Sequence, residues 1–162
     1  MTFAHLQLSA LAVCIGIPLL AGAVSGFASM KDLNSWYAAL RKPSFSPPNS
    51  VFGPVWTALY ILMGVSLYLI WKAPPSPDRS AAMIAFGMQL VLNFAWSFLF
   101  FRFHRIALAF REIVLLYLCI IWMMALFARV DAAAAWLQVP YLLWVGFATV
   151  LNGAFRSRNP GF

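Results

Sequence analysis

The chain is dominated by long stretches that contain no Lys, Arg, Asp or Glu. These stretches cover residues 1–30, 51–71, 81–101 and 132–155. About 18 consecutive apolar residues are enough for a helix to cross the hydrocarbon core of a bilayer. Only 9% of the residues are charged, whereas a soluble domain carries about 25% charged residues. The sequence therefore predicts an all-α integral membrane protein and excludes an ordinary soluble domain.

Five spans are expected within one domain that comprises residues 1–162. Four of them follow the uncharged stretches, and another apolar segment begins at Ile106, although Arg111 and Glu112 lie near its start. In chain order, the spans are expected at about residues 6–28, 52–71, 81–101, 106–128 and 132–155. Pro140 falls inside the last span and predicts a kink there, because a proline removes a helical hydrogen bond.

Residues 31–50 form the longest connection between the expected spans. The second half contains Pro43, Pro47 and Pro48, which forbid a regular helix, whereas residues 32–40 can still form a short one. Long loops in compact proteins tend to be lids or binding segments. We therefore interpret residues 31–50 as a lid.

Basic residues outnumber acidic ones and gather at the ends of the spans. The chain has 11 Lys and Arg against 4 Asp and Glu, a formal net charge of +7. All but Lys72, Arg79 and Arg129 fall on the side of the lid and the C-terminus. Because positive charge stays on the cytoplasmic side, we expect a cytoplasmic C-terminus and an N-terminus outside, in a bacterial membrane. Charge placed in this way serves topology and the lipid bilayer rather than nucleic-acid binding.

The sequence contains no conventional catalytic or metal-binding motif. Cys14 and Cys119 lie in separate apolar stretches and indicate no metal site. The carboxylates are scattered at or near the ends of the spans, so that no acid–base pair can be assembled from them: Asp32, Asp78, Glu112 and Asp131. A proton-coupled pump normally buries a carboxylate in mid-membrane. The sequence therefore argues against acid–base catalysis and against such a pump.

Three of the expected helices carry polar and aromatic residues on one face. Residues spaced by three, four or seven positions share a face, and this spacing relates Trp56 with Tyr60, Gln89 with Asn93 and Trp96, and Tyr141 with Trp144, Ala148 and Asn152. An amide in hydrocarbon costs several kcal/mol without a partner, so these faces are expected to point into the bundle. Two interpretations stay open: amides that join helices, or an aromatic cavity for a large, planar, mostly apolar ligand.

Gly22 and Gly26 in the first span are four residues apart. Small residues at this spacing let two helix backbones approach closely. These glycines form either the face of a homodimer or a packing contact within the bundle, and the sequence leaves both interpretations open.

Four blocks of sequence stand out in order along the chain. They read WYAALRKPSFSPP at Trp36–Pro48, FGPVWTALY at Phe52–Tyr60, QLVLNFAW at Gln89–Trp96 and PYLLWVGFATVLN at Pro140–Asn152. Together they resemble the TspO/translocator-protein family, the tryptophan-rich sensory proteins that include the mitochondrial peripheral benzodiazepine receptor. The resemblance implies a five-helix bundle, commonly a homodimer, that binds porphyrins such as protoporphyrin IX beneath a first loop that acts as a lid.

The resemblance also implies which residues bind the ligand. With Tyr60 and Phe45 included, the expected ligand-binding residues are Trp36, Tyr37, Phe45, Trp56, Tyr60, Asn93, Trp96, Tyr141, Trp144, Ala148 and Asn152. Some family members also bind cholesterol and synthetic benzodiazepine-site ligands. Here Gly153 stands where the family's sterol-recognition stretch needs a tyrosine, which weakens the expectation of sterol binding by that route.

Three functions are compatible with this pattern. The first is a membrane receptor or sensor that binds protoporphyrin IX or a haem-like tetrapyrrole as a ligand and requires no cofactor. The second is a light-dependent porphyrin-degrading enzyme, in which the resemblance suggests a photochemical role for Trp56 and Trp144. The third is a transporter of porphyrin or lipid.

Overall fold

Helices account for most of the chain. The computed structural model describes residues 3–161, with side-chain surroundings from residue 7 onward except at residue 34. Within these residues the elements, in chain order, are α1 (Phe3–Asn34), α2 (Trp36–Ala39), α3 (Asn49–Lys72), α4 (Pro77–Ser97), the π-helical segment η1 (Phe98–Arg102), α5 (Ile106–Val130), α6 (Ala132–Trp136) and α7 (Val139–Arg158).

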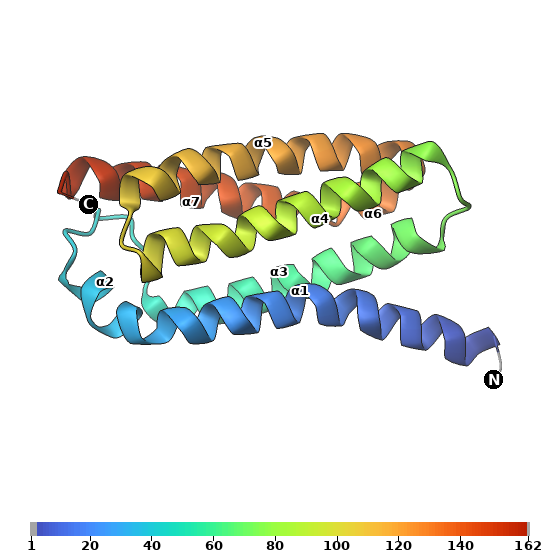
Figure 1. Cartoon of the computed structure of the whole chain (residues 1–162), viewed down its shortest axis with the longest axis horizontal. Helices are drawn as coiled ribbons and strands as arrows, with labels where there is room; N and C mark the ends of the chain where they lie inside the picture. The colour runs from blue at the N-terminus through green and yellow to red at the C-terminus, as the bar shows by residue number, and fades with distance from the viewer. Residues whose placement is uncertain (1–2, 162) are drawn as a thin grey trace.

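The long helices lie side by side along the long axis of the molecule (Figure 1). In the described part of the chain, 5 helical segments are long and apolar enough to cross a membrane: Gln7–Leu33, Asn49–Lys72, Pro77–Arg102, Ile106–Val130 and Ala132–Arg158. No strand occurs among residues 3–161. The predicted all-α bundle of five transmembrane helices is confirmed, and its ends differ from the expected ones by a few residues.

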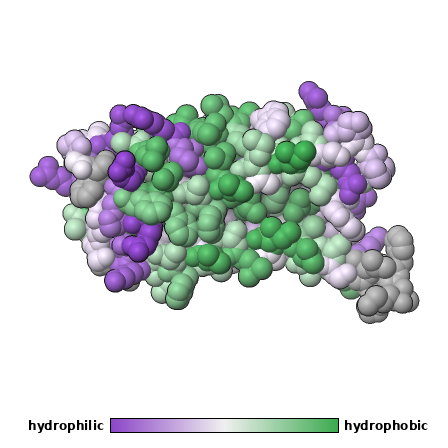
Figure 2. All heavy atoms as spheres, in the orientation of Figure 1, coloured by the Kyte–Doolittle hydropathy of each residue, from purple (hydrophilic) through white to green (hydrophobic). Residues whose placement is uncertain are grey.

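The face of the bundle seen in Figure 2 is apolar in its middle and polar at both ends. Large apolar side chains point outward there, such as Phe27, which is 81% exposed, and Val91, which is 68% exposed. In water, a continuous apolar surface of this kind would drive aggregation. In a bilayer the acyl chains of the lipids cover it, as expected for a chain that spans the membrane.

The fifth span consists of two helices rather than one kinked helix. α6 ends at Trp136, and α7 begins at Val139 with Pro140 in its first turn. In a continuous helix, Pro140 would have no N–H to donate to the carbonyl of Trp136, and its ring would collide with that carbonyl. The predicted kink inside the span is therefore corrected to a break at residues 137–138.

The lid loop is shorter than predicted. α1 continues to Asn34 and α3 begins at Asn49, so the lid loop, as named from here on, comprises residues 35–48 and contains α2. The short helix expected within residues 32–40 is present as the end of α1 and as α2. The lid loop lies across the end of the bundle at which α7 ends (Figure 1).

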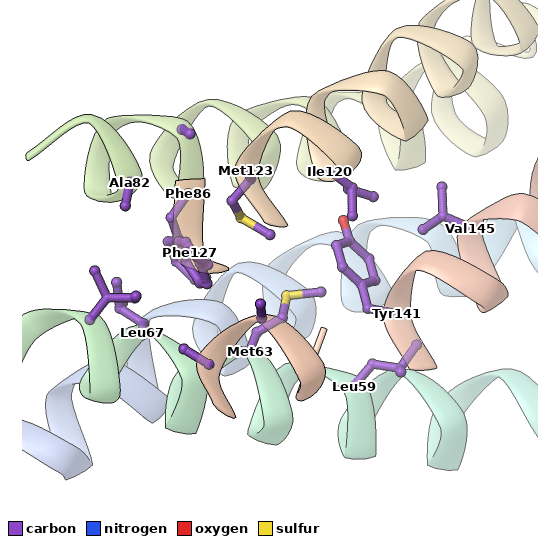
Figure 3. Close-up of a cluster of buried hydrophobic side chains, with 14 of the residues drawn as sticks. Leu59, Met63, Leu67, Ala82, Phe86, Ile120, Met123, Phe127, Tyr141 and Val145 are labelled. Carbon is purple, nitrogen blue, oxygen red and sulfur yellow. The ribbon is translucent and has the colours of Figure 1, made fainter. Parts of the chain in front are cut away.

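The apolar core lies between α3, α4, α5 and α7 (Figure 3). Met63, Ile120, Met123 and Phe127 have no exposed surface. The ring of Phe86 stacks on that of Phe127 with 6.4 Å between ring centroids. Tyr141 lies in the same cluster (Figure 3), and its ring is as fully buried as theirs.

Two glycines allow α1 and α3 to approach each other. A Cβ atom added to Gly64 would collide with the backbone of Ile15 on α1, and one added to Gly22 would collide with the ring of Tyr60 on α3. A Cβ at Gly26 would meet no atom within 4 Å. Of the two interpretations of the glycine pair, packing within the bundle holds for Gly22. A dimer contact at Gly26 stays a prediction.

We predict that Gly64→Ala lowers the free energy of unfolding by about 1–3 kcal/mol, because the new methyl group forces the α1 backbone away from α3. Thermal unfolding of the detergent-solubilised protein measures the change. Gly16→Ala on α1 is the control, since no atom lies within 4 Å of its added Cβ and alanine favours the helix. Equal losses in both variants would contradict the close contact between α1 and α3.

Candidate functional site

A chain of buried hydrogen bonds joins α3, α4 and α7. The Tyr60 hydroxyl donates to Asn93 Oδ1 over 2.9 Å, and Asn93 Nδ2 donates to the Tyr141 hydroxyl over 3.2 Å. The Tyr141 hydroxyl in turn donates to Gln89 Oε1 over 2.8 Å. Gln89 and Asn93 are 0% and 3% exposed, so the prediction that both amides face the bundle interior is confirmed.

Trp56 lies beside this hydrogen-bonded chain. Its indole stacks on Tyr60 with 5.4 Å between centroids and an interplanar angle of 27°. The edge of the same indole meets the Tyr141 ring at 6.3 Å. Tyr60, Asn93 and Tyr141 were expected to bind ligand, and the structure shows that they bind one another. This arrangement holds Trp56 in place through its stacking partner.

A small cavity lies between this network and the lid loop. Its volume is about 20 Å³, enough for about one water molecule. The residues that line it are Tyr37, Phe52, Trp96, Phe100, Phe101, Ala148, Leu151, Asn152 and Phe155. Four of them were predicted site residues: Tyr37, Trp96, Ala148 and Asn152.

The other cavity residues were missed, although a spacing signal for some of them is present. Phe100 follows Trp96 by four positions, and Leu151 and Phe155 follow Ala148 by three and seven, so these side chains share faces with predicted residues. Phe101 has no such signal, because it follows Trp96 by five positions, a spacing that matches the wider turn of the π-helical segment η1 and not that of an α-helix.

Some of the buried polar atoms without partners lie at or beside this cavity. Asn152 is 1% exposed, and neither its Oδ1 nor its Nδ2 has a hydrogen-bond partner among the described residues. The indole N–H groups of Trp96 and Trp144 are likewise buried without a partner in the described part of the chain. Atoms in the same state also occur away from the cavity, in Gln89, Glu112 and Gln138. Buried polar groups normally find partners, so each of these groups is an exception.

Tyr37 closes the cavity from the lid side. It is 2% exposed, and its ring centroid lies 5.7 Å from Phe101 and 5.4 Å from Phe155. The Lys42 ammonium lies 4.4 Å from the centre of the Tyr37 ring. Burial raises the pKa of the Tyr37 hydroxyl, which lies 3.5 Å from Ser46 Oγ. The hydroxyl therefore stays protonated at neutral pH and is able to donate a hydrogen bond.

The remaining predicted residues do not line the cavity. Trp36 stacks on His104 at 4.2 Å, and His104 Nε2 lies 3.2 Å from Asp32 Oδ1. Phe45 is 47% exposed on the lid loop, with its ring 6.4 Å from Phe147. Trp144 packs against Phe52 and Phe147 at 6.0 Å and 5.6 Å, so it lies one residue behind the cavity wall.

Glu112 lies six positions after the first residue of α5, near the end of its span as the sequence suggested. Both of its carboxylate oxygens are buried and have no hydrogen-bond partner among the described residues. Neighbouring residues on a helix point about 100° apart, so the outward turn of the exposed Arg111 places Glu112 against the bundle. A carboxyl group is therefore present inside the bundle after all.

A second hollow lies on the outside of the bundle, away from the cavity. A shallow apolar groove of about 680 Å³ runs along the outer faces of α4 and α5, between Met88, Val91 and Trp122, where lipid acyl chains cover the protein. No group of three or more His, Cys, Asp or Glu side chains is placed to hold a metal ion among the residues whose side chains the structure describes, 7–161 without 34.

We predict that Asn93→Leu lowers the free energy of unfolding by about 1–3 kcal/mol, because it removes the acceptor of the buried Tyr60 hydroxyl and the amide that donates to the Tyr141 hydroxyl. Thermal unfolding in detergent measures the loss. In the control, Thr149→Val, the lost hydrogen bond is a local one to the Val145 carbonyl, which remains the regular acceptor of the helix. An Asn93→Leu protein as stable as the control would show that the network adds nothing to stability.

Comparison with known proteins places the chain among relatives. Residues 14–158 match the TspO/MBR family. "Tryptophan-rich protein TspO" from Chlorobaculum tepidum is 39% identical over 158 residues, which cover 95% of this chain and 98% of that protein. The protein of the same name from Archaeoglobus fulgidus is 37% identical, covering 85% of this chain and 89% of its own length.

A human relative shows the same likeness over a shorter stretch. "Translocator protein" from Homo sapiens is 37% identical over 130 residues, which cover 78% of this chain and 76% of that protein. The family match at residues 14–158 includes α3 to α7, the helices that form the core and most of the cavity wall. The chain belongs to the TspO/MBR family of membrane proteins.

Proposed function

We propose that this protein is a membrane receptor or sensor that binds a porphyrin of the protoporphyrin IX type between the lid loop and the ends of α3, α4 and α7. Family membership supports the proposal, and the aromatic cavity wall supports it independently. Flat rings such as Phe52, Trp96 and Phe100 suit the face of a planar macrocycle. In this proposal the porphyrin is a ligand and not a required cofactor.

The observation that carries the proposal is the state of Asn152. A buried amide without partners costs about 1–3 kcal/mol, and a leucine of similar size would avoid that cost. An amide at the cavity wall is useful when a ligand offers it a hydrogen-bond partner. The N–H of Trp96 adds a second donor at the same cavity, which suits an acceptor such as a carboxylate or carbonyl oxygen.

The size of the cavity requires that binding opens it. Pockets for ligands of drug size are about 300–1,000 Å³, whereas this cavity has about 20 Å³. Its roof is Tyr37 on the lid loop, and its walls are side chains of α3, α4, η1 and α7. A tetrapyrrole therefore enters only if the lid loop moves away, and the aromatic rings then contact the ligand instead of one another.

The proposal leaves other apolar ligands as weaker candidates. Gly153, which stands in place of the tyrosine of the sterol-recognition stretch, lies against α5, and a Cβ added there would meet the Phe110 ring at 3.1 Å. A tyrosine would not fit at this position while Phe110 keeps its place. Benzodiazepine-site ligands and lipids serve as competitors in the experiment below rather than as the proposed ligand.

We predict opposite effects of Asn152→Leu on stability and on binding. The substitution removes two unpartnered amide atoms, so thermal stability stays the same or rises, while the affinity for protoporphyrin IX falls by about tenfold or more through loss of a hydrogen-bonding group. The measurement is a titration of the detergent-purified protein in the dark, followed by quenching of tryptophan fluorescence. Val150→Leu, on the lipid-facing side of α7 and 64% exposed, is the control.

Two outcomes of that titration would overturn the proposal. One is quenching by protoporphyrin IX that never saturates in the unaltered protein, because this indicates partition into the detergent rather than a site. The other is unchanged affinity in Asn152→Leu, because this would show that the cavity is not part of the binding site. Loss of stability together with loss of affinity would show that Asn152 has a structural role only.

Light distinguishes the receptor from the porphyrin-degrading enzyme. Indole groups are the oxidisable groups of this site, and Trp144 lies one residue behind its wall. For a receptor, we expect the absorbance of bound porphyrin under illumination to decay no faster than that of free porphyrin. A new absorbing product that forms only with protein, and no longer forms in Trp144→Phe, would favour the enzyme instead.

A further inference from the structure

The side chain of Asn159 contacts the backbone of the lid loop. Arg41 N donates to Asn159 Oδ1 over 3.0 Å, and Asn159 Nδ2 donates back to the Arg41 carbonyl over 3.2 Å. The two residues are 118 positions apart in the chain. The amide thus satisfies both backbone polar groups of one residue, as a neighbouring strand would. We call this pair of hydrogen bonds the Asn159–Arg41 bridge.

Hydrogen bonds to the end of α7 fix the position of Asn159. It follows α7 directly, and both its backbone N–H and its Nδ2 donate to the Phe155 carbonyl, at 3.0 Å and 2.9 Å. Asn159 is 9% exposed. Because Phe155 is also a wall of the cavity, the bridge connects the lid loop to a fixed point on the helix that lines the site.

The bridge is located where the lid loop covers the cavity. Arg41 comes directly after the buried Leu40 and four residues after Tyr37, the roof of the cavity. The next residue is held as well, because Arg158 Nη1 donates to the Lys42 carbonyl over 3.3 Å. Three residues further along the lid loop, Phe45 is 47% exposed.

We propose that the Asn159–Arg41 bridge holds the lid loop closed, and that Asn159 thereby sets the rate at which ligand enters and leaves the cavity. Asn159 is a positioning residue, since it acts through Arg41 and Tyr37 and does not line the cavity. The closure of the lid loop is a property of the free protein. Only the effect on ligand exchange rests on the proposed porphyrin binding.

The chemistry of the bridge depends on the residue at 159 and not on the side chain at 41. Arg41 contributes only its backbone N–H and carbonyl, so Arg41→Ala keeps both hydrogen bonds. Asn159→Ala loses both. Asn159→Asp keeps the acceptor for Arg41 N–H but loses the donor to the Arg41 carbonyl, so we expect an effect between those of the other two variants.

Hydrogen–deuterium exchange of the ligand-free full chain in lipid nanodiscs tests the bridge. We expect amide exchange in residues 36–43 to rise by about tenfold in Asn159→Ala, because the lid loop of this variant can open without breaking the two hydrogen bonds of the bridge. Exchange in α3 and α4 stays unchanged. Arg41→Ala and Ser157→Ala are the controls. Arg41→Ala keeps the backbone groups of the bridge, and the Ser157 hydroxyl donates within α7, to the Ala154 carbonyl. We expect that neither control raises exchange in the lid loop.

The pattern of exchange separates a bridge from a simple helix cap. If Asn159 serves α7 alone, exchange in Asn159→Ala rises at residues 155–158 and stays unchanged at residues 36–43, which overturns the proposal. A rise in Arg41→Ala equal to that in Asn159→Ala also overturns it. If Asn159→Ala does not fold, Asn159→Asp replaces it, and unchanged exchange of the lid loop in that variant counts against the bridge.

Stopped-flow mixing with protoporphyrin IX tests the second half of the proposal. Opening of the lid loop precedes both uptake and release, so in Asn159→Ala we expect both rates to rise by about tenfold while Kd changes little. A slower or unchanged release rate overturns the role in ligand exchange. If the unaltered protein does not bind the porphyrin, the proposed function fails, whereas the exchange experiment still decides on the closure of the lid loop.

Discussion

The absence of water from the membrane interior is the constraint on which the rest of this structure depends. Each polar group inside the bundle must find its partner in the protein. Tyr60, Asn93, Tyr141 and Gln89 meet most of this condition with one another, with only Gln89 Nε2 left without a partner among the described residues, and they thereby fix the rotation of α3, α4 and α7. The glycines that bring α1 against α3 then complete the scaffold.

The buried polar atoms that lack partners among the described residues fall into two groups. Asn152 and the indole N–H groups of Trp96 and Trp144 lie at or beside the cavity, toward the lid end of the bundle. Glu112, Gln138 and Nε2 of Gln89 do not line that cavity. Only the first group adjoins the place at which we propose that a ligand binds.

The sequence predicted the spans and the inward faces, because hydrophobic length and helical spacing are local properties. It did not show that Asn93 and Tyr141 bind each other while Ala148 and Asn152 line a cavity, since all four are spaced alike and only the rotation of the helices separates them. Phe101 was missed because a π-helical turn breaks the regular spacing. Trp36 and Phe45 depend on how the lid loop folds back, which spacing along the chain does not encode.

The bridge between Asn159 and the lid loop uses backbone atoms on one side, and this has a consequence for how the family evolves. Any residue other than proline that can adopt the backbone conformation at position 41 supports the contact, so substitutions there need no compensating change at position 159. The two positions are therefore expected to vary independently among homologues. Methods that infer contacts from correlated substitutions would overlook this contact, even though it joins the first connection of the fold to its last helix.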